Sequence, residues 1–151
     1  MDKIRGFELV SRVEGNSDYK LPVRGTKNAA AYDFFSPISF IIKPGEKISI
    51  QTGIKSYFQA DEGLYIITRS GNGAKRRVTL ANNVGLVDAD YYNNSGNEGE
   101  IILVLVNDGN LDFAVEKGDR IAQCWFQKVL FADDDKTIGT RSGGLGSTGM
   151  K

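Results

Sequence analysis

Short β-rich runs separated by turn residues recur along this chain, and they constrain its fold more than any other feature. Turn-forming sequences lie between them, for example Lys43-Pro44-Gly45-Glu46 and Asn107-Asp108-Gly109-Asn110. This spacing predicts an all-β sandwich or barrel. Helix is expected only as a turn or two within residues 71–76, where two glycines weaken it. The predicted strands are residues 39–42, 47–50, 64–67, 78–81, 101–106, 111–115 and 122–129.

The size and charge balance of the chain fit one globular domain. Its 151 residues are 40% hydrophobic and 25% charged, which is enough to bury a core. Because 19 Lys and Arg residues balance 19 Asp and Glu residues, the net charge gives no reason to expect binding to nucleic acid or an anionic membrane. No apolar run approaches the roughly 20 residues that span a bilayer, and residues 1–10 lack the apolar core of a signal peptide. We therefore expect a cytoplasmic protein without nucleic-acid or membrane partners.

The titratable residues limit the chemistry that is available. Cys124 is the only cysteine, and its place in the apolar run 121–129 favours a buried, inert thiol over a nucleophile. The chain contains no histidine, the commonest general base and metal ligand. Acid–base or metal chemistry must therefore rest on carboxylates.

Two polar clusters lie in or beside apolar strands. Asp33 stands between aromatic residues, where a carboxylate is either a turn or edge residue or the anchor of a metal-bound water. Arg69, Ser70 and Gly71 follow the apolar run 64–67. A guanidinium, a hydroxyl and flexible backbone at a strand end can form a phosphate cradle, although a basic surface loop has the same composition.

Residues 82–106 contain a third cluster and are predicted to form a β-hairpin. Under strand alternation Asp88 and Asp90 would share a face, and solvated edge charges are the simpler explanation for them. That explanation accounts neither for Gly85 nor for the two tyrosines that follow Asp90. A hairpin whose arms are spread at the base would expose backbone N–H and C=O groups that could pair with the edge of a planar base.

The last two clusters are the start of the final strand and the tail. Arg120 and Gln123 are polar residues within 118–123, and a structural salt bridge is the simplest role for Arg120. In residues 141–151, Arg141 offers forked donors and the glycines allow backbone N–H groups to approach an anion, whereas a frayed terminus is the alternative. The composition predicts a β-barrel domain over residues 1–136 and a flexible phosphate-binding arm over residues 137–151.

Taken in order, the five clusters resemble the five motifs of the homotrimeric dUTP pyrophosphatases (dUTPases). Each motif is moderately specific alone, and five in this order are very specific. The resemblance implies a dUTPase-like β-clip or jelly-roll barrel with a flexible C-terminal arm. The extended loop after the third motif looks most like versions from Gram-positive bacteria and their phages. The motifs are AYD (31–33), RSG (69–71), GLVDADY (85–91), GDRIAQ (118–123) and RSGGLGSTG (141–149).

The resemblance implies hydrolysis of dUTP to dUMP and pyrophosphate by attack of water on the α-phosphate. Such an activity limits uracil in DNA and supplies dUMP for dTMP synthesis. Mg²⁺ would be held mainly by the triphosphate and waters, which removes the need for histidine ligands. Asp88 would be the general base that holds the nucleophilic water, Gln123 would hold the catalytic water or a phosphate, and Asp33 would contact Mg²⁺ only through a water.

The resemblance also assigns the substrate contacts. Tyr91 would stack under the deoxyribose and leave no room for a 2′-hydroxyl, while Asn83 and backbone groups of both hairpin arms would read uracil and exclude a 5-methyl group. The RSG loop would hold the α- and β-phosphates, and the arm would close over the γ-phosphate. The predicted substrate-binding residues are Arg69, Ser70, Gly71, Asn83, Gly85, Leu86, Val87, Tyr91, Ile102, Arg141, Gly144, Leu145, Ser147 and Thr148.

In this family the hairpin, the phosphate loop and the arm of one site come from three subunits, so the resemblance implies a homotrimer with three shared sites. The chain departs from the family pattern at Ala31 and Thr68, which replace a common Gly and Pro, and in the inserted loop 93–98, which affects the alignment of Ile102. Leu145 replaces the usual Phe, and a lost base–aromatic contact can cost about 1–3 kcal/mol.

Two other functions share this fold. One is a dCTP deaminase, with or without pyrophosphate release, and the other is a catalytically idle nucleotide-binding regulator. The DADY sequence at 88–91 and the intact tail favour dUTP hydrolysis over deamination. Loss of Asp88, Arg69 or Arg141 would indicate an idle protein, and all three are present.

Overall fold

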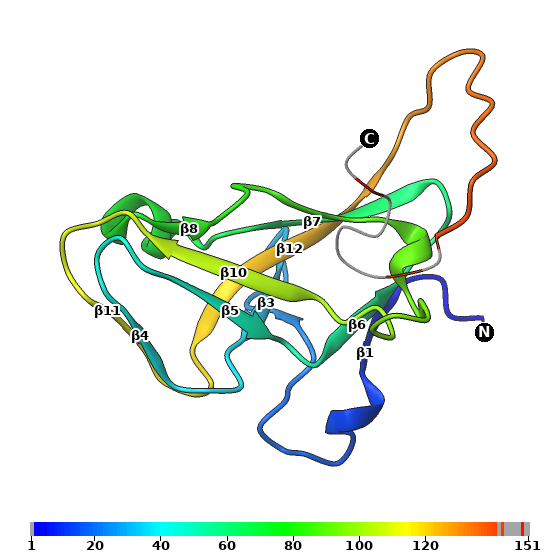
Figure 1. The fold of residues 1–151 in the computed structure, drawn as a ribbon. Coiled ribbons are helices and arrows are strands. Elements are labelled where there is room, and N and C mark those ends of the chain that lie inside the picture. Colours follow the sequence, from blue (N-terminus) through cyan, green and yellow to red (C-terminus); the bar gives the residue numbers. More distant parts are fainter. Residues whose placement is uncertain (1, 142, 144–148, 150–151) are drawn as a thin grey trace.

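The computed structural model describes residues 2–141, 143 and 149, and within them nearly all regular structure is β (Figure 1). The all-β prediction is therefore confirmed. No helix in these residues is both long enough and apolar enough to cross a membrane. The strands are β1 (Gly6–Leu9), β2 (Val23–Arg24), β3 (Tyr32–Phe35), β4 (Phe40–Ile42), β5 (Lys47–Gln51), β6 (Ile54–Tyr57), β7 (Glu62–Ile67), β8 (Val78–Leu80), β9 (Gly85–Val87), β10 (Ile102–Asn107), β11 (Phe113–Val115) and β12 (Arg120–Lys128). The helical turns are η1 (Ser11–Val13), η2 (Gly71–Lys75) and η3 (Ala89–Tyr91).

Strand β12 is at the centre of the largest sheet, which has the antiparallel order β2-β3-β12-β7-β9. Its residues Ile121, Ala122 and Cys124 have no exposed surface. A smaller sheet has the order β5-β10-β8, and β1-β6 and β11-β4 form two further pairs. In Figure 1 β12 passes behind β10 and β5, so the two main sheets form two layers.

The hydrophobic core lies between these layers because alternate residues of their strands face inward. In β10, Leu103 and Leu105 are buried while their neighbours in sequence are partly exposed. They belong to one cluster with Leu64 and Ile66 of β7. The strands that end at the functional site are thus fixed on their inner faces by a common core.

The structure contains strands that the sequence pattern missed, namely β1, β2 and β6. Strand β6 has no apolar run because Lys55 and Ser56 occupy two of its positions, and both are buried. Lys55 Nζ donates to Glu98 Oε1 and Asn93 Oδ1, each at 2.8 Å, and Ser56 Oγ donates to the Gly6 carbonyl at 2.9 Å. Partners distant in sequence therefore permit polar residues in a buried strand.

Candidate functional site

A cavity of about 250 Å³ lies between β9 and β10. Strand β9 is at the edge of its sheet and pairs only with β7. Strand β8 pairs with β10 only at Leu105–Asn107, which leaves the start of β10 without a strand partner on that side. Strands β9 and β10 are therefore not hydrogen-bonded to each other, so the predicted β-hairpin is wrong; the two strands belong to different sheets and face each other across the cavity. The cavity is lined by Ile66, Leu80, Asn82, Gly85, Leu86, Val87, Asp88, Tyr91, Ile101, Ile102, Leu103, Val104 and Arg141.

The structure brings most of the predicted uracil- and sugar-contacting residues to this cavity. Asn83 is the exception: its neighbour Asn82 lines the cavity instead. Asn83 has a positive φ of 62°, and its N–H donates to the Leu80 carbonyl at 2.9 Å in a turn. Asparagine tolerates this left-handed conformation. Sequence reasoning missed Asn82 because two adjacent asparagines are equivalent until the turn is known.

Two carboxylates at the mouth of the cavity bind one guanidinium. Asp88 has an extended backbone and precedes the 3₁₀ turn η3, so Asp88 and Asp90 do not alternate along a strand, and that part of the sequence argument was wrong. The turn brings them together instead. Arg141 Nε donates to Asp90 Oδ1 at 3.0 Å, and Arg141 Nη2 donates to Asp88 Oδ2. The hydrogen bond to Asp90, reinforced by the charges of both carboxylates, raises the pKa of Arg141.

Arg141 also lies over the ring of Tyr91, with Cζ 5.7 Å from the ring centroid. Only 11% of its side chain is exposed, although it lies beyond the last strand. The resemblance placed this residue in the site of a neighbouring subunit, whereas here it occupies the cavity of its own chain, where the two carboxylates attract it. The predicted arm residues Gly144, Leu145, Ser147 and Thr148 lie outside the described residues.

The remaining predicted residues gather in a second cluster around Asp33, which we call the phosphate cradle: Asp33, Arg69, Ser70, Gly71 and Gln123. Asp33 Oδ1 is 3.3 Å from Arg69 Nε, and the amide of Gln123 donates to the Thr68 carbonyl at 3.3 Å. Gln123 and Asp33 are register partners on β12 and β3. The cluster therefore rests on the centre of the large sheet.

Two further residues contribute to this cluster. Arg120 Nη1 lies 3.6 Å from Asp33 Oδ2, which agrees with the structural salt bridge expected for Arg120. Ser70 and Gly71 are exposed where the chain enters the π-helical turn η2. In the same turn the Nδ2 of Asn72 is buried with no partner among the described residues. Such a donor is costly to leave unpaired.

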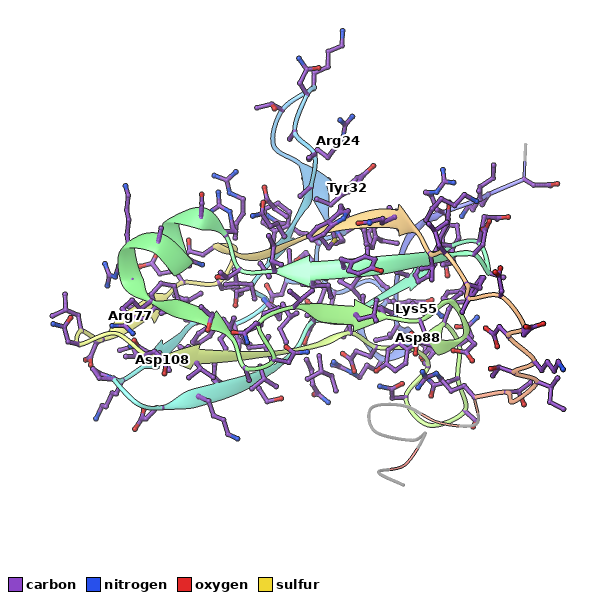
Figure 2. The ribbon with its side chains drawn as sticks, turned by 90° about the horizontal axis from the view of Figure 1, so that it is seen from above. Arg24, Tyr32, Lys55, Arg77, Asp88 and Asp108 are labelled. Atoms are coloured by element: carbon purple, nitrogen blue, oxygen red, sulfur yellow. The ribbon has the colours of Figure 1, made fainter. Side chains whose placement is uncertain are left out.

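The cavity and the phosphate cradle do not meet within one chain. None of the cradle residues lines the cavity that Asp88 lines. Turn η2 lies at one end of the molecule and η3 near the other in both views (Figure 1). Figure 2 labels Asp88 apart from Arg77, which follows η2. Among the described residues, the lining of the cavity thus contains no member of the cradle.

Comparisons with known proteins agree on one family. A family model described as dUTPase matches residues 17–149. The deoxyuridine 5′-triphosphate nucleotidohydrolase of Lactococcus lactis subsp. lactis (strain IL1403) is 42% identical over 149 residues, which cover 97% of this chain and 99% of that protein. The solved dUTPase of Streptococcus mutans is 38% identical, with a TM-score of 0.72 over 85% of this chain and 98% of that chain.

A more distant solved structure is similar in fold. It is a mutant dUTPase from phage phi11 of S. aureus, described for the coordination of a structural Mg(II) ion. It is 19% identical, with a TM-score of 0.69 over 89% of this chain and 97% of that chain. The β-clip or jelly-roll architecture expected from the sequence is thus found in close and distant relatives alike.

Proposed function

Because this chain belongs to the dUTPase family, we propose that it hydrolyses dUTP to dUMP and pyrophosphate. The observation that carries the proposal is the cavity between β9 and β10, which has Asp88 and Tyr91 at its mouth. Its volume of about 250 Å³ is below the roughly 300–1,000 Å³ of typical ligand pockets. It therefore suits the base and sugar, while the triphosphate extends beyond it.

Uracil is recognised by backbone groups in this proposal. The outer edge of β9 and, on the side away from β5, the first residues of β10 lack strand partners, so their outward N–H and C=O groups are available to a planar base. A fixed backbone pattern discriminates between bases by hydrogen bonding, because a wrong base leaves buried polar groups unpaired. The position of Asn82 on the cavity wall adds a side-chain amide that can donate or accept.

Asp88 acts as the general base toward the water that attacks the α-phosphorus. Its carboxylate is paired with Arg141. The guanidinium occupies a carboxylate oxygen that would hold the water, so Arg141 must exchange this partner before the reaction. The triphosphate supplies the new partner, since phosphate oxygens match the guanidinium fork. Binding of the substrate would thereby free the base.

The phosphate cradle receives the α- and β-phosphates. Arg69 and the backbone at Gly71 contribute donors, and Gln123 orients a phosphate oxygen or the water. The described residues contain no group of three or more possible metal ligands, which argues against a dedicated metal cage. Mg²⁺ held by the triphosphate, and touching Asp33 only through a water, fits this residue set. When bound, the ion would neutralise charge that develops on the phosphate oxygens.

The complete site is shared between subunits of a homotrimer in this proposal. The absence of every cradle residue from the described lining of the cavity supports it. Residues 137–151 serve as the arm, and the exposed side chain of Ile138, 94% accessible, agrees with a segment outside the core. In this proposal the triphosphate binds Arg141, and its position therefore determines which subunit's cavity the arm covers.

A substrate panel tests the function. Pyrophosphate release is measured with dUTP, dCTP, dTTP and UTP in the presence of Mg²⁺, for wild type and Asp88→Asn. We expect turnover of dUTP alone and a loss of at least ~10²-fold in the variant, with little change in nucleotide binding. Pyrophosphate release from dCTP alone would indicate a deaminase that also releases pyrophosphate. Binding without turnover would indicate a regulator.

A further inference from the structure

The loop between η3 and β10 is a closed hydrogen-bonded platform and not a loose insertion. Asn94 is only 9% exposed, and its Oδ1 accepts from the backbone N–H groups of Gly96 and Asn97 at 2.9 and 3.1 Å. Its Nδ2 donates to Asn97 Oδ1 at 2.8 Å. Gly99 has a φ of +85°, and a Cβ there would lie 2.7 Å from the Tyr91 carbonyl oxygen. Only glycine fits at this closure of the platform.

The platform forms hydrogen bonds with Tyr91, which lines the cavity. Asn97 Nδ2 donates to the Tyr91 hydroxyl at 2.7 Å, and that hydroxyl donates to the Glu100 carbonyl at 2.7 Å. Asn94 Nδ2 donates to the Tyr91 carbonyl at 2.7 Å. The phenol oxygen is therefore held both as a donor and as an acceptor. A hydroxyl oxygen held at two points fixes the direction of the long axis of the ring, so the ring is anchored from outside the cavity.

The far side of the platform is anchored to the body of the protein. Lys55 is 8% exposed, and its ammonium binds Glu98 and Asn93, both at 2.8 Å. Glu98 also accepts from Ser11 Oγ at 2.8 Å. Figure 2 shows Lys55 and Asp88 at the same end of the molecule. The platform is thus fixed at one side to β6 and η1 and at the other to the tyrosine.

We propose that Asn97 is a positioning residue that sets the discrimination between deoxyribose and ribose nucleotides by locking the Tyr91 hydroxyl. This inference rests on the proposed function, in which the ring of Tyr91 contacts the sugar. A ring that can tilt makes room for a 2′-hydroxyl, whereas a locked ring does not. Asn97 reaches the cavity only through the phenol oxygen, because its Nδ2 donates to that oxygen while its Oδ1 accepts from Asn94 and Gly99 within the loop, and Asn97 itself does not line the cavity.

A double-mutant cycle tests the proposal. The ratio of kcat/KM for dUTP to that for UTP is measured for wild type, Asn97→Ala, Tyr91→Phe and the double variant. Asn97→Ala should lower this ratio about three- to tenfold, the scale of one neutral hydrogen bond. In the Tyr91→Phe background the same change should have no further effect, because the hydroxyl is already absent. Asn110→Ala, an exposed asparagine in a distant turn, is the matched control and should leave the ratio unchanged.

A purely structural role for Asn97 gives a different pattern. Loss of loop integrity would lower kcat/KM for both nucleotides equally, and would do so in the Tyr91→Phe background as well. Either result overturns the proposal.

A second readout does not depend on turnover. In protein with ¹³C-labelled tyrosine, assigned by comparison with Tyr91→Phe, Asn97→Ala should shift the Cζ resonance of Tyr91, because the phenol oxygen loses a hydrogen-bond donor. An unchanged resonance would refute the lock even if wild type failed to hydrolyse dUTP. A shifted resonance in a protein without dUTP turnover would retain the lock and reject the proposed function.

Discussion

Two inactive variants should restore each other when they assemble into one trimer. Asp88→Asn removes the base from the cavity, and Arg69→Ala removes a guanidinium from the phosphate cradle, none of whose residues lines that cavity. Each variant alone should lose at least ~10²-fold in turnover, the usual scale for a general base or a charge-stabilising donor. Neither change touches the core, so both proteins should fold and assemble.

The expected recovery of turnover follows from the way in which two subunits share one site. In a cyclic trimer each site takes its cavity from one subunit and its cradle from a neighbour. A trimer that contains both variants, in a 2:1 or a 1:2 ratio, has one site in which an intact cavity meets an intact neighbouring cradle. One site in three is then intact, so turnover of the mixed trimers should return to about a third of wild type and exceed either variant at least ~30-fold.

The assay is pyrophosphate release by mixed trimers, prepared by co-expression with two affinity tags and isolated by sequential purification. Mixing Arg69→Ala with Gln123→Ala is the matched control. Both changes affect the cradle, so no cradle in that mixture is intact, and turnover should stay at the level of the single variants. If verified mixed trimers of Asp88→Asn and Arg69→Ala also stayed there, the site would lie within one chain and the shared-site reasoning would be refuted.

Three further predictions address the arm, the platform and the core. Deletion of residues 139–151 should leave a folded assembly with severely reduced turnover, because the arm contributes contacts to the transition state and none to the core. Circular dichroism and sedimentation test the folding and assembly, and a truncated protein that unfolds would contradict the prediction. Hydrogen bonds from Lys55 and Ser11 lower the pKa of Glu98 from 4.5 to about 2. These bonds therefore stabilise the folded state fully above pH 4.5, and this stabilisation is lost as the pH falls toward 2. In urea unfolding, the stability difference between wild type and Glu98→Gln should therefore be constant above pH 4.5 and shrink below it. Burial raises the pKa of the Cys124 thiol, so a thiol reagent should leave the native protein unmodified and react only after unfolding.

The strands that could be predicted from sequence are those whose burial follows from their own residues. Strands β7, β10 and β12 are apolar runs, and the structure places each of them at the core. Strand β6 could not be found in this way, because Lys55 is acceptable in the interior only with Glu98, 43 residues later, as its partner. A local pattern contains no information about such a partner, since its position depends on the completed fold.

The same distinction between local residues and distant partners applies to the functional site. Motif order and spacing predicted which residues gather, and the cavity indeed combines Gly85–Val87 with Ile102 from the opposite strand. The convergence of Asp88 and Asp90 was predicted for the wrong reason, because a 3₁₀ turn and not strand alternation brings both carboxylates to Arg141. The grip of the platform on Tyr91 could not be predicted, since it depends on the rotamers of two loop asparagines.

The guanidinium groups of the proposed phosphate-binding residues are paired with carboxylates of the same chain. Arg141 is paired with Asp88 and Asp90, and Arg69 and Arg120 are paired with Asp33. Without these pairs, two groups of like charge would face each other or remain partly buried alone, and either arrangement destabilises a fold. A triphosphate therefore does not enter an empty basic site; it replaces carboxylates that already hold the same guanidinium groups. Because one set of ion pairs is exchanged for another, most of the net free energy of nucleotide binding comes from contacts with the base and sugar. The cavity therefore determines nucleotide selectivity more than the phosphate contacts do.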